Sequence, residues 1–509
     1  MGGPGASGPR PPEASSSPPW LGWAKPVECA PLACLTAACN RVTLWPFRPC
    51  SPISMFVSIN PATSQPFASY EAHDAAAMAA ILDAGRAAWR LWRDVPLDER
   101  CRALVRLADL FEARVPELAR LASWEMGKLR PEAEAEVRRC ARACRFYAKM
   151  APRWLADEAV PSETGRRLIV YDPLGTILAV MPWNFPYWQA IRAVAPLLAV
   201  GNAAAIKPAP NVMGSALALE ALFPEAGFPA DLVRVLRLPE GLVGQAIAHP
   251  AVAGVTLTGS AAAGAAVGAL AGAAVKKAVM ELGGADAFIV LADAVLDDCC
   301  SAAETARMRV CGQACIAAKR FIVERPLYDD FTRRLAERLA AHRAGDPDDP
   351  AATVGPLARL DLLENLDRQV RESLAAGARL VAGGHRLDRP GYFYAPTLLA
   401  DVRPGMPAFD EELFGPVAAL IAADDAEDAL ALANASPYGL AGSVWTADVP
   451  RGLALARRLE VGMATVNAVP RSDFRLPFGG VKRSGYGREL ARHGLLEFAN
   501  IKTIVVEDS

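Results

Sequence analysis

Short apolar segments alternate with helical stretches along most of the chain, and this alternation constrains the fold more than any other feature. The apolar segments 168–171 and 176–180 are separated by Pro173 and Gly175, a pattern typical of neighbouring strands. Helices are then predicted at 188–198 and 215–222, and strands at 203–206 and 233–236. Strands and helices in this order predict a parallel, doubly wound α/β sheet.

The second half of the chain repeats this pattern, and the region before the first sheet is helical. Because 509 residues exceed what one hydrophobic core usually supports, more than one domain is expected. Apolar residues at helical spacing predict amphipathic helices at 72–91, 97–121 and 132–150. Further strands are predicted at 288–290, 321–323 and 418–421, which indicates a second α/β domain.

Charge and cysteine content exclude several classes of function. The 54 basic and 56 acidic residues give a formal charge of −2, which supplies no attractive field for nucleic acid or an anionic membrane and favours a small-molecule partner. Eleven cysteines are too sparse for a disulfide scaffold, and the absence of CxxC and HxxxH spacing predicts no metal site. Reduced thiols and the absence of a targeting pattern favour the cytoplasm.

The first 53 residues differ in composition from the rest of the chain. They begin with a segment rich in Gly, Pro and Ser and continue with Trp, Cys and Pro without helical or alternating period. We therefore expect residues 1–53 to be a disordered extension, and Met55 is a candidate for the true start of the protein.

Two residues with catalytic chemistry, Cys315 and Glu281, occur among several short motifs. Cys315 ends the segment 312–315 and Glu281 begins the segment 281–284. The other motifs are PWNFP at 182–186, KP at 207–208, TGS at 258–260, ELFGP at 412–416 and PFGG at 477–480. In this order, between about residues 59 and 505, they resemble the aldehyde dehydrogenase superfamily.

The resemblance implies a division into two doubly wound α/β domains and a small β element. The implied NAD(P)-binding domain comprises residues 54–150 and 172–281, and the implied catalytic domain comprises residues 282–484. Residues 151–171 and 485–509 would form a bridging element. Such bridging strands pair between subunits, so a homodimer or homotetramer is expected.

The same resemblance implies three catalytic residues. Aldehyde oxidation needs a covalent adduct that expels hydride, followed by release of the acyl group by water. Cys315 would be the nucleophile, Glu281 would activate the water, and the Asn184 amide with the Cys315 backbone N–H would stabilise the oxyanion. Taken singly, these residues also fit a buried inert thiol, a solvent-facing acid and a turn asparagine.

A strand at 255–257 runs into a segment that is suited to a dinucleotide. A helix that begins after it would direct backbone N–H groups at a pyrophosphate, although the segment lacks the GxGxxG pattern and also fits simple close packing. The resemblance places Lys207 on the adenine ribose, with Glu412 and Phe414 at the nicotinamide ribose and ring; solvated surface charges are the alternative. The predicted cofactor-binding residues are Trp183, Lys207, Gly259, Ser260, Gly264, Glu412 and Phe414.

The position three residues after Lys207 bears on the choice of cofactor. Many NAD-preferring relatives carry Glu there, whereas this chain has Pro210. A carboxylate that would repel the 2′-phosphate of NADP is therefore missing, and both NAD and NADP remain open.

Arg192, Arg309 and Ser472 have the motif offsets of residues that bind the substrate carboxylate in succinate-semialdehyde dehydrogenases. Two guanidinium groups and a hydroxyl suit a carboxylate. The expected activity is NAD(P)-dependent oxidation of succinate semialdehyde to succinate. An alternative substrate is glutarate semialdehyde. Alternative functions are a broad short-chain aldehyde dehydrogenase, cofactor-independent ester hydrolysis by cysteine, and a catalytically silent cofactor-binding scaffold. Instead of binding a substrate, either arginine could cap a helix or pair with an acid.

The segment before Cys315 departs from the family pattern. The family usually has Asn five residues before the nucleophile, whereas this chain has Val310, followed by Cys311 in place of a small residue. The loop could therefore be reshaped, and a reversible disulfide between Cys311 and Cys315 is a further hypothesis.

Overall fold

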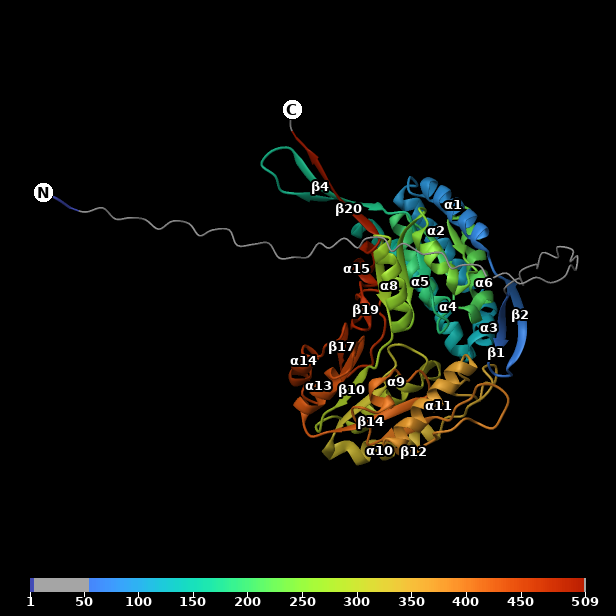
Figure 1. The fold of residues 1–509 in the computed structure, drawn as a ribbon, viewed down its shortest axis with the longest axis vertical. Coiled ribbons are helices and arrows are strands. Elements are labelled where there is room, and N and C mark those ends of the chain that lie inside the picture. The colour runs from blue at the N-terminus through green and yellow to red at the C-terminus, as the bar shows by residue number, and fades with distance from the viewer. Residues whose placement is uncertain (4–54, 508–509) are drawn as a thin grey trace, which may run out of the picture. The chain divides into compact units, whose positions relative to one another are not determined.

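The computed structural model describes residues 1–3 and 55–507. The predicted disorder of residues 1–53 lies outside this range, apart from residues 1–3, which belong to no helix or strand. Two large sheets with helices packed against them form the main body of the described chain (Figure 1).

The first sheet has six strands in the order β19-β9-β8-β5-β6-β7. All neighbours are parallel except the edge strand β19, which is antiparallel to β9. The chain builds outward from β5 on one side and then returns to place β8 on the other, so the carboxyl ends of β5 and β8 border a topological switch point, where such sheets bind ligands. The strands are β5 (Thr176–Val180), β6 (Ala203–Lys207), β7 (Val233–Val235), β8 (Val252–Thr258), β9 (Lys277–Glu281) and β19 (Gly485–Tyr486).

The second sheet has seven strands in the order β12-β13-β14-β11-β10-β16-β17. Only the edge strand β12 is antiparallel to its neighbour. Two α/β domains, as predicted, are therefore confirmed. The strands are β10 (Ala287–Val290), β11 (Arg320–Glu324), β12 (Arg379–Ala382), β13 (Thr397–Ala400), β14 (Val417–Ala423), β16 (Ala441–Trp445) and β17 (Met463–Val466).

The predicted helix at 97–121 is wrong in one respect, because two helices occupy this region. They are α2 (Leu97–Ala113) and α3 (Val115–Met126), separated at Arg114, which has φ −109° and ψ 18°. Pro116 lies in the first turn of α3, where its missing N–H needs no partner but where a continuous helix would be interrupted. The predicted helices at 72–91 and 132–150 are confirmed as α1 (Ala75–Trp92) and the longer α4 (Arg130–Trp154).

Helices cover both faces of the first sheet. One hydrophobic cluster joins its strands to α2, α3, α4 and α5, and a second joins them to α1, α7 and α8. Every residue of α5 is buried, so this helix lies in the interior behind the candidate site. The remaining helices are α5 (Trp188–Val200), α6 (Met213–Glu225), α7 (Val243–Ala248), α8 (Ala261–Ala273), α9 (Leu296–Met308), α10 (Arg325–Ala340), α11 (Leu360–Ala375), α12 (Pro407–Asp410), α13 (Ala426–Asn434), α14 (Val449–Ala456) and α15 (Ala491–Leu496), with 3-10 turns η1 (Pro210–Val212), η2 (Glu240–Leu242) and η3 (Arg309–Gly312).

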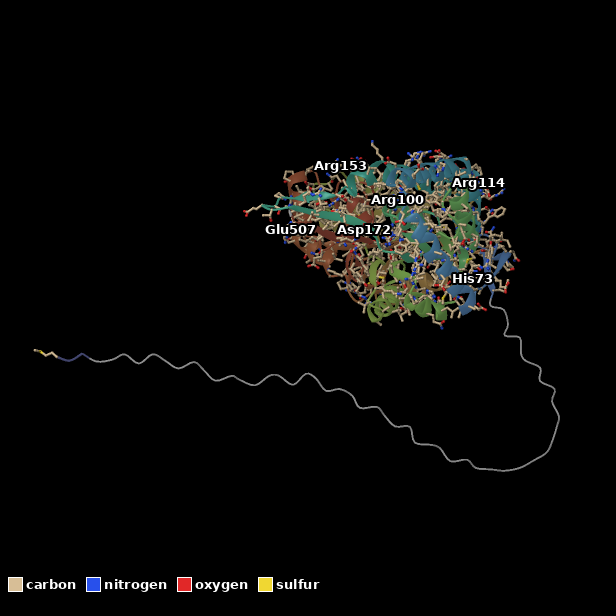
Figure 2. All side chains as sticks on the ribbon, turned by 90° about the horizontal axis from the view of Figure 1, so that it is seen from above. His73, Arg100, Arg114, Arg153, Asp172 and Glu507 are labelled. Carbon is tan, nitrogen blue, oxygen red and sulfur yellow. The ribbon has the colours of Figure 1, made fainter. Side chains whose placement is uncertain are left out.

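A separate three-stranded antiparallel sheet has the order β20-β4-β3. An antiparallel ladder over Ala499–Val506 joins β20 to β4, and ion pairs of Lys502 with Asp172 and of Arg167 with Glu507 link the two strands. Figure 2 labels Asp172 and Glu507 on this sheet. Of the segment 485–509, which was predicted to bridge subunits, only β20 belongs to this sheet, because β19 joins the six-stranded one. The short strands outside the two main sheets are β1 (Met55–Asn60), β2 (Gln65–Glu71), β3 (Glu158–Val160), β4 (Arg166–Pro173), β15 (Tyr438–Gly439), β18 (Val481–Lys482) and β20 (Ala499–Val506).

Candidate active site

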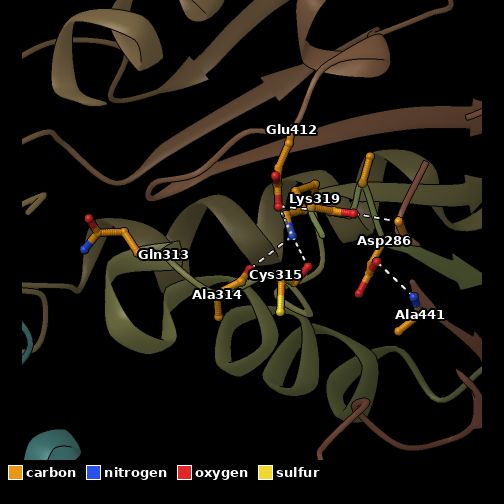
Figure 3. A network of polar contacts seen from close by, with 12 residues as sticks. Asp286, Gln313, Ala314, Cys315, Lys319, Glu412 and Ala441 are labelled. Atoms are coloured by element: carbon orange, nitrogen blue, oxygen red, sulfur yellow. Dashed lines mark hydrogen bonds and ion pairs between the residues drawn. The ribbon is translucent and has the colours of Figure 1, made fainter. Parts of the chain in front are cut away.

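Cys315 lies in the loop between η3 and β11, and a buried lysine fixes this loop. The ammonium group of Lys319 donates to the carbonyl oxygens of Ala314, at 3.1 Å, and of Cys315 itself. It also lies 3.5 Å from a carboxylate oxygen of Glu412 (Figure 3). Lys319 was not predicted to be a site residue, although a fully buried position just before strand β11 is an unusual place for a lysine.

The segment that follows Glu281 connects the two large sheets and packs against the Cys315 loop. Its Gly284 N–H donates to the Glu412 carboxylate at 3.1 Å, and the carbonyl oxygen of Asp286 accepts from the Lys319 N–H at 3.0 Å. A Cβ atom on Gly283 would overlap the Glu412 carboxylate. The glycines therefore permit a close approach between the segments that carry the predicted nucleophile and base.

Burial dominates the ionisation of the nucleophile. It raises the pKa of the Cys315 thiol to about 12, and the positive charges of Arg192 and Lys319 oppose this shift only in part. The thiol is therefore protonated at neutral pH in this state, and the predicted role of Cys315 as a nucleophile requires removal of this proton.

Glu281 is the last residue of β9 and is only 2% exposed, so the solvent-facing alternative is wrong. Neither carboxyl oxygen has a hydrogen-bond partner in the described part of the chain. Burial, followed by the negative charge of Glu489, raises the pKa of Glu281 well above its ordinary value. A buried carboxyl group of raised pKa that keeps free oxygens is suited to exchanging a proton with water.

Asn184 lies beside the same loop. It is buried, and its amide nitrogen donates to the carbonyl oxygen of Gln313 at 3.0 Å, two residues before Cys315. Because a side-chain amide carries two N–H bonds, one donor remains for an oxyanion. The predicted oxyanion role of Asn184 stays a prediction.

A cavity of about 310 Å³ opens at Cys315. The three residues predicted to bind a substrate carboxylate, Arg192, Arg309 and Ser472, all line it. The structure thus brings together side chains from α5, η3 and the segment after β17. Other polar lining residues include two arginines that the sequence analysis missed, Arg139 and Arg471.

The sequence contained a signal for Arg139. It follows Glu132 and Glu136 at positions i, i+4 and i+7, so the three charged residues share one face of α4. Glu136 is buried, with its carboxylate bound by the Tyr187 and Trp188 N–H groups. Charged residues on the buried face of a helix usually have a specific partner or function.

The arginines that line the cavity differ in the hydrogen-bond and ion-pair partners that the protein provides for their guanidinium groups. Arg192 forms a buried ion pair with Glu489 and lies 4.6 Å from the centre of the Phe478 ring. Arg139 donates to the backbone carbonyl of Ser472 and lies 4.3 Å from the centre of the Trp188 ring. Burial, followed by the positive charges of Arg309 and Arg192, lowers the pKa of Arg139 to about 10.

Most of the predicted cofactor residues follow strands β5, β6 and β8 of the first sheet, whereas Glu412 and Phe414 lie between α12 and β14 of the second domain. Ser260 is the N-cap of α8 and accepts from the Ala263 N–H at 3.2 Å, whereas the buried Lys207 ends β6. The rings of Trp183 and Phe414 meet edge-on, 5.6 Å apart. A helix N-terminus and a lysine at the carboxyl ends of parallel strands fit a dinucleotide phosphate and ribose, and these individual roles remain predictions.

A model of the aldehyde dehydrogenase family matches residues 48–504. The chain belongs to this family. It is therefore an enzyme that oxidises an aldehyde to a carboxylate with NAD or NADP, and the predicted family and fold are confirmed.

Several relatives have names that agree on one activity. The chain is 45% identical over 447 residues to a probable succinate-semialdehyde dehydrogenase [NADP(+)] of Synechocystis sp., covering 88% of this chain and 98% of the relative. It is 45% identical over 454 residues to the succinate semialdehyde dehydrogenase [NAD(P)+] Sad of Escherichia coli, covering 89% and 98%. The structure of the succinic semialdehyde dehydrogenase of Streptococcus pyogenes with NADP+ matches with a TM-score of 0.87 at 35% identity, covering 89% of this chain and all of that one.

The segment before the nucleophile of this aldehyde dehydrogenase adopts a left-handed conformation. Val310, Cys311 and Gly312 have φ values of 51°, 54° and 70°. For a β-branched residue this is a rare conformation that costs about 1–3 kcal/mol. The buried Val310 side chain offsets part of this cost by packing in a small cluster, whose other members are Met126, Val212 and Ala358.

Both cysteines of the proposed redox pair are free thiols. Cys311 packs into the core of the second domain, whereas Cys315 packs against the core of the first. This arrangement disfavours the disulfide hypothesis.

Gly264 has a packing role in this aldehyde dehydrogenase. A Cβ atom at this position would overlap the side chain of Leu282, the residue after the predicted base. We expect Gly264→Ala to lower the free energy of unfolding by about 1–3 kcal/mol, as overpacked cores do, and to reduce activity. Gly272 in the same helix faces open space, so Gly272→Ala should be neutral or stabilise by up to about 1 kcal/mol. Urea unfolding of both variants tests this, and equal stabilities would contradict it.

Among the described residues, 1–3 and 55–507, no group of three or more His, Cys, Asp or Glu is placed to hold a metal ion. None of the described helices is long and apolar enough to cross a membrane.

Proposed function

We propose that this aldehyde dehydrogenase oxidises succinate semialdehyde to succinate. The observation that carries the proposal is the concentration of four arginines, Arg139, Arg192, Arg309 and Arg471, around the cavity at Cys315. The whole chain has a formal charge of only −2, so this positive charge is local. A carboxylate at the far end of the aldehyde would neutralise it. The names of the Synechocystis and Escherichia coli relatives support the same substrate.

The predicted catalytic residues then act in sequence. The thiol proton of Cys315 passes to solvent, the sulfur then attacks the aldehyde carbon as a thiolate, and the Asn184 amide with the Cys315 N–H stabilises the resulting oxyanion. An oxidised nicotinamide, when bound at the predicted cofactor residues, would accept the hydride that leaves this carbon. Glu281, as a carboxylate, then takes a proton from the water that attacks the thioester, which releases succinate and returns the Cys315 thiol.

We propose that NADP is accepted in addition to NAD. Pro210, the first residue of η1, offers no carboxylate that would repel a 2′-phosphate. The names of the relatives support this: two of those described above include NADP. Initial rates with both cofactors at equal concentration are the test, and a rate only with NAD would contradict it.

We also propose a cytoplasmic homodimer or homotetramer with no nucleic-acid or membrane partner. The sheet of β3, β4 and β20 supports association, because it exposes several apolar side chains. The free thiols of the described residues support a reducing compartment. The exposed apolar residues on this sheet are Val160, Ile501, Ile504, Val505 and Val506.

Arg309→Ala is expected to separate the substrate proposal from a broad short-chain activity. Because the variant loses a charge-assisted contact to a carboxylate, kcat/KM for succinate semialdehyde should fall about 100-fold. Butyraldehyde has the same carbon chain length without the carboxylate, so its kcat/KM should fall less than about threefold. Glutarate semialdehyde in the same assay measures the tolerated tail length. Equal losses with charged and uncharged aldehydes would contradict the proposal, and absence of cofactor reduction by the unaltered protein would favour the scaffold alternative.

A further inference from the structure

Two of the four arginines that line the cavity have no hydrogen-bond or ion-pair partner within the described part of the chain. Arg192 is paired with Glu489, and Arg139 is held by the carbonyl of Ser472 and the Trp188 ring. Arg309 and Arg471 are exposed at the cavity, and in the described part of the chain their guanidinium groups have neither a hydrogen bond nor an ion pair.

Arg309 and Arg471 also lie close enough together to affect each other. Although both side chains are exposed, partial desolvation of its guanidinium group lowers the pKa of Arg309, and the positive charge of Arg471 lowers it further. Glu132 opposes this shift, but its carboxylate is already bound by the N–H groups of Val310, at 2.7 Å, and Leu129, at 3.3 Å. Two like charges that share a cavity wall without a bound acid create a site for an anion.

The local sequence holds Arg471 at the rim of this cavity. It follows Val469 and the buried Pro470, which also line the cavity, and it precedes Ser472. The backbone carbonyl of Ser472 accepts from Arg139. This bond fixes Ser472, and burial fixes Pro470, the other neighbour. The backbone on both sides of Arg471 is therefore held in place.

We propose that Arg471 is a specificity-determining residue that binds the substrate carboxylate together with Arg309. This inference rests on the proposed oxidation of succinate semialdehyde. Arg192 keeps Glu489 as its partner and acts as a positioning residue beside the predicted base. The assignment differs from the motif-based prediction, in which Arg192 and Arg309 hold the carboxylate.

Arg471→Met tests the assignment because methionine keeps an unbranched chain and removes the charge. We expect KM for succinate semialdehyde to rise about tenfold with kcat little changed, because a charge-assisted contact to the tail is lost in both ground and transition state. Arg471→Lys should recover part of the affinity by restoring the charge without the planar fork. Inhibition of butyraldehyde oxidation by succinate gives a second readout, and its inhibition constant should rise by a similar factor.

Arg475→Met is the matched control. Arg475 lies four residues further along the same segment, is largely exposed, and is paired with Asp473, with Nε 2.9 Å from a carboxylate oxygen. It does not belong to the cavity lining. Its replacement should leave KM for succinate semialdehyde within about twofold, since exposed ion pairs contribute little.

The outcomes separate this inference from the proposed function. An unchanged KM and an unchanged succinate inhibition constant in Arg471→Met, with the unaltered enzyme still preferring succinate semialdehyde, would overturn the role of Arg471 alone. Equal losses with butyraldehyde and succinate semialdehyde would also overturn it, by showing a structural effect. An unaltered enzyme that does not distinguish the two aldehydes would overturn the proposed function, and the inference with it.

Discussion

Replacement of Cys315 by Ala is expected to reduce cofactor reduction by about 10⁴-fold or more. The half-buried thiol is the nucleophile in the proposed reaction, and the covalent path is lost without it. The measurement is the absorbance of the reduced cofactor during turnover of succinate semialdehyde. Cofactor binding, followed by calorimetry, should be preserved, because the predicted cofactor residues lie on other segments.

Cys311→Ala is the control for that variant. Cys311 is on the same short segment, but its thiol is buried in the core of the second domain. A loss of stability of about 1 kcal/mol with activity largely retained is expected. If Cys315→Ala kept more than about a hundredth of the activity, the assignment of the nucleophile would be wrong.

Glu281→Gln is expected to stop the reaction after one turnover. The substitution keeps the shape of the side chain and removes the base, so turnover should fall about 10²–10⁴-fold. Formation of the thioester should persist, which predicts a burst of reduced cofactor equal to the number of active sites. Mass spectrometry would find the acyl group on Cys315. Hydroxylamine, a nucleophile that needs no general base, should release this group, whereas a variant without a burst would contradict the role of Glu281.

The raised pKa of Glu281 sets the direction of the pH dependence. A carboxyl group with a raised pKa is protonated below that pKa and accepts a proton from water only above it. The thiol of Cys315, with a pKa of about 12, also gains reactivity as pH rises. Activity of the unaltered enzyme should therefore increase as the pH rises and fall as the pH is lowered. In Glu281→Gln, the rate at which the acyl group is released should no longer show the part of the pH dependence that comes from Glu281.

Much of the fold follows from local pattern, and the exceptions have local reasons. The segment 176–180 coincides with β5, because it is a buried apolar run that begins just after Gly175. The break between α2 and α3 was missed because the apolar residues keep their helical spacing across it, although Pro116 is a local signal for it: proline interrupts the interior of a helix and is favoured in the first turn of a new one.

Several members of the candidate site were predicted from the sequence, whereas Lys319, Arg139, Arg471 and the partners of the site residues were not. Motif order identified Cys315, and the structure places the predicted Arg192 and Arg309 at the same cavity. Sequence gave no indication that Glu489, almost 300 residues further along the chain, would neutralise Arg192. Such a contact depends on how α5 packs against the segment before α15, which no local pattern determines.

The buried lysine of the nucleophile loop determines the direction of a peptide plane. In a trans peptide, the carbonyl and the following N–H point in opposite directions. Because Lys319 draws the Ala314 carbonyl to one side, the Cys315 N–H is turned to the other, and it has no hydrogen-bond partner in the described chain. If this N–H is the predicted donor for the oxyanion, its direction is set when the loop folds and needs no rearrangement when a substrate binds.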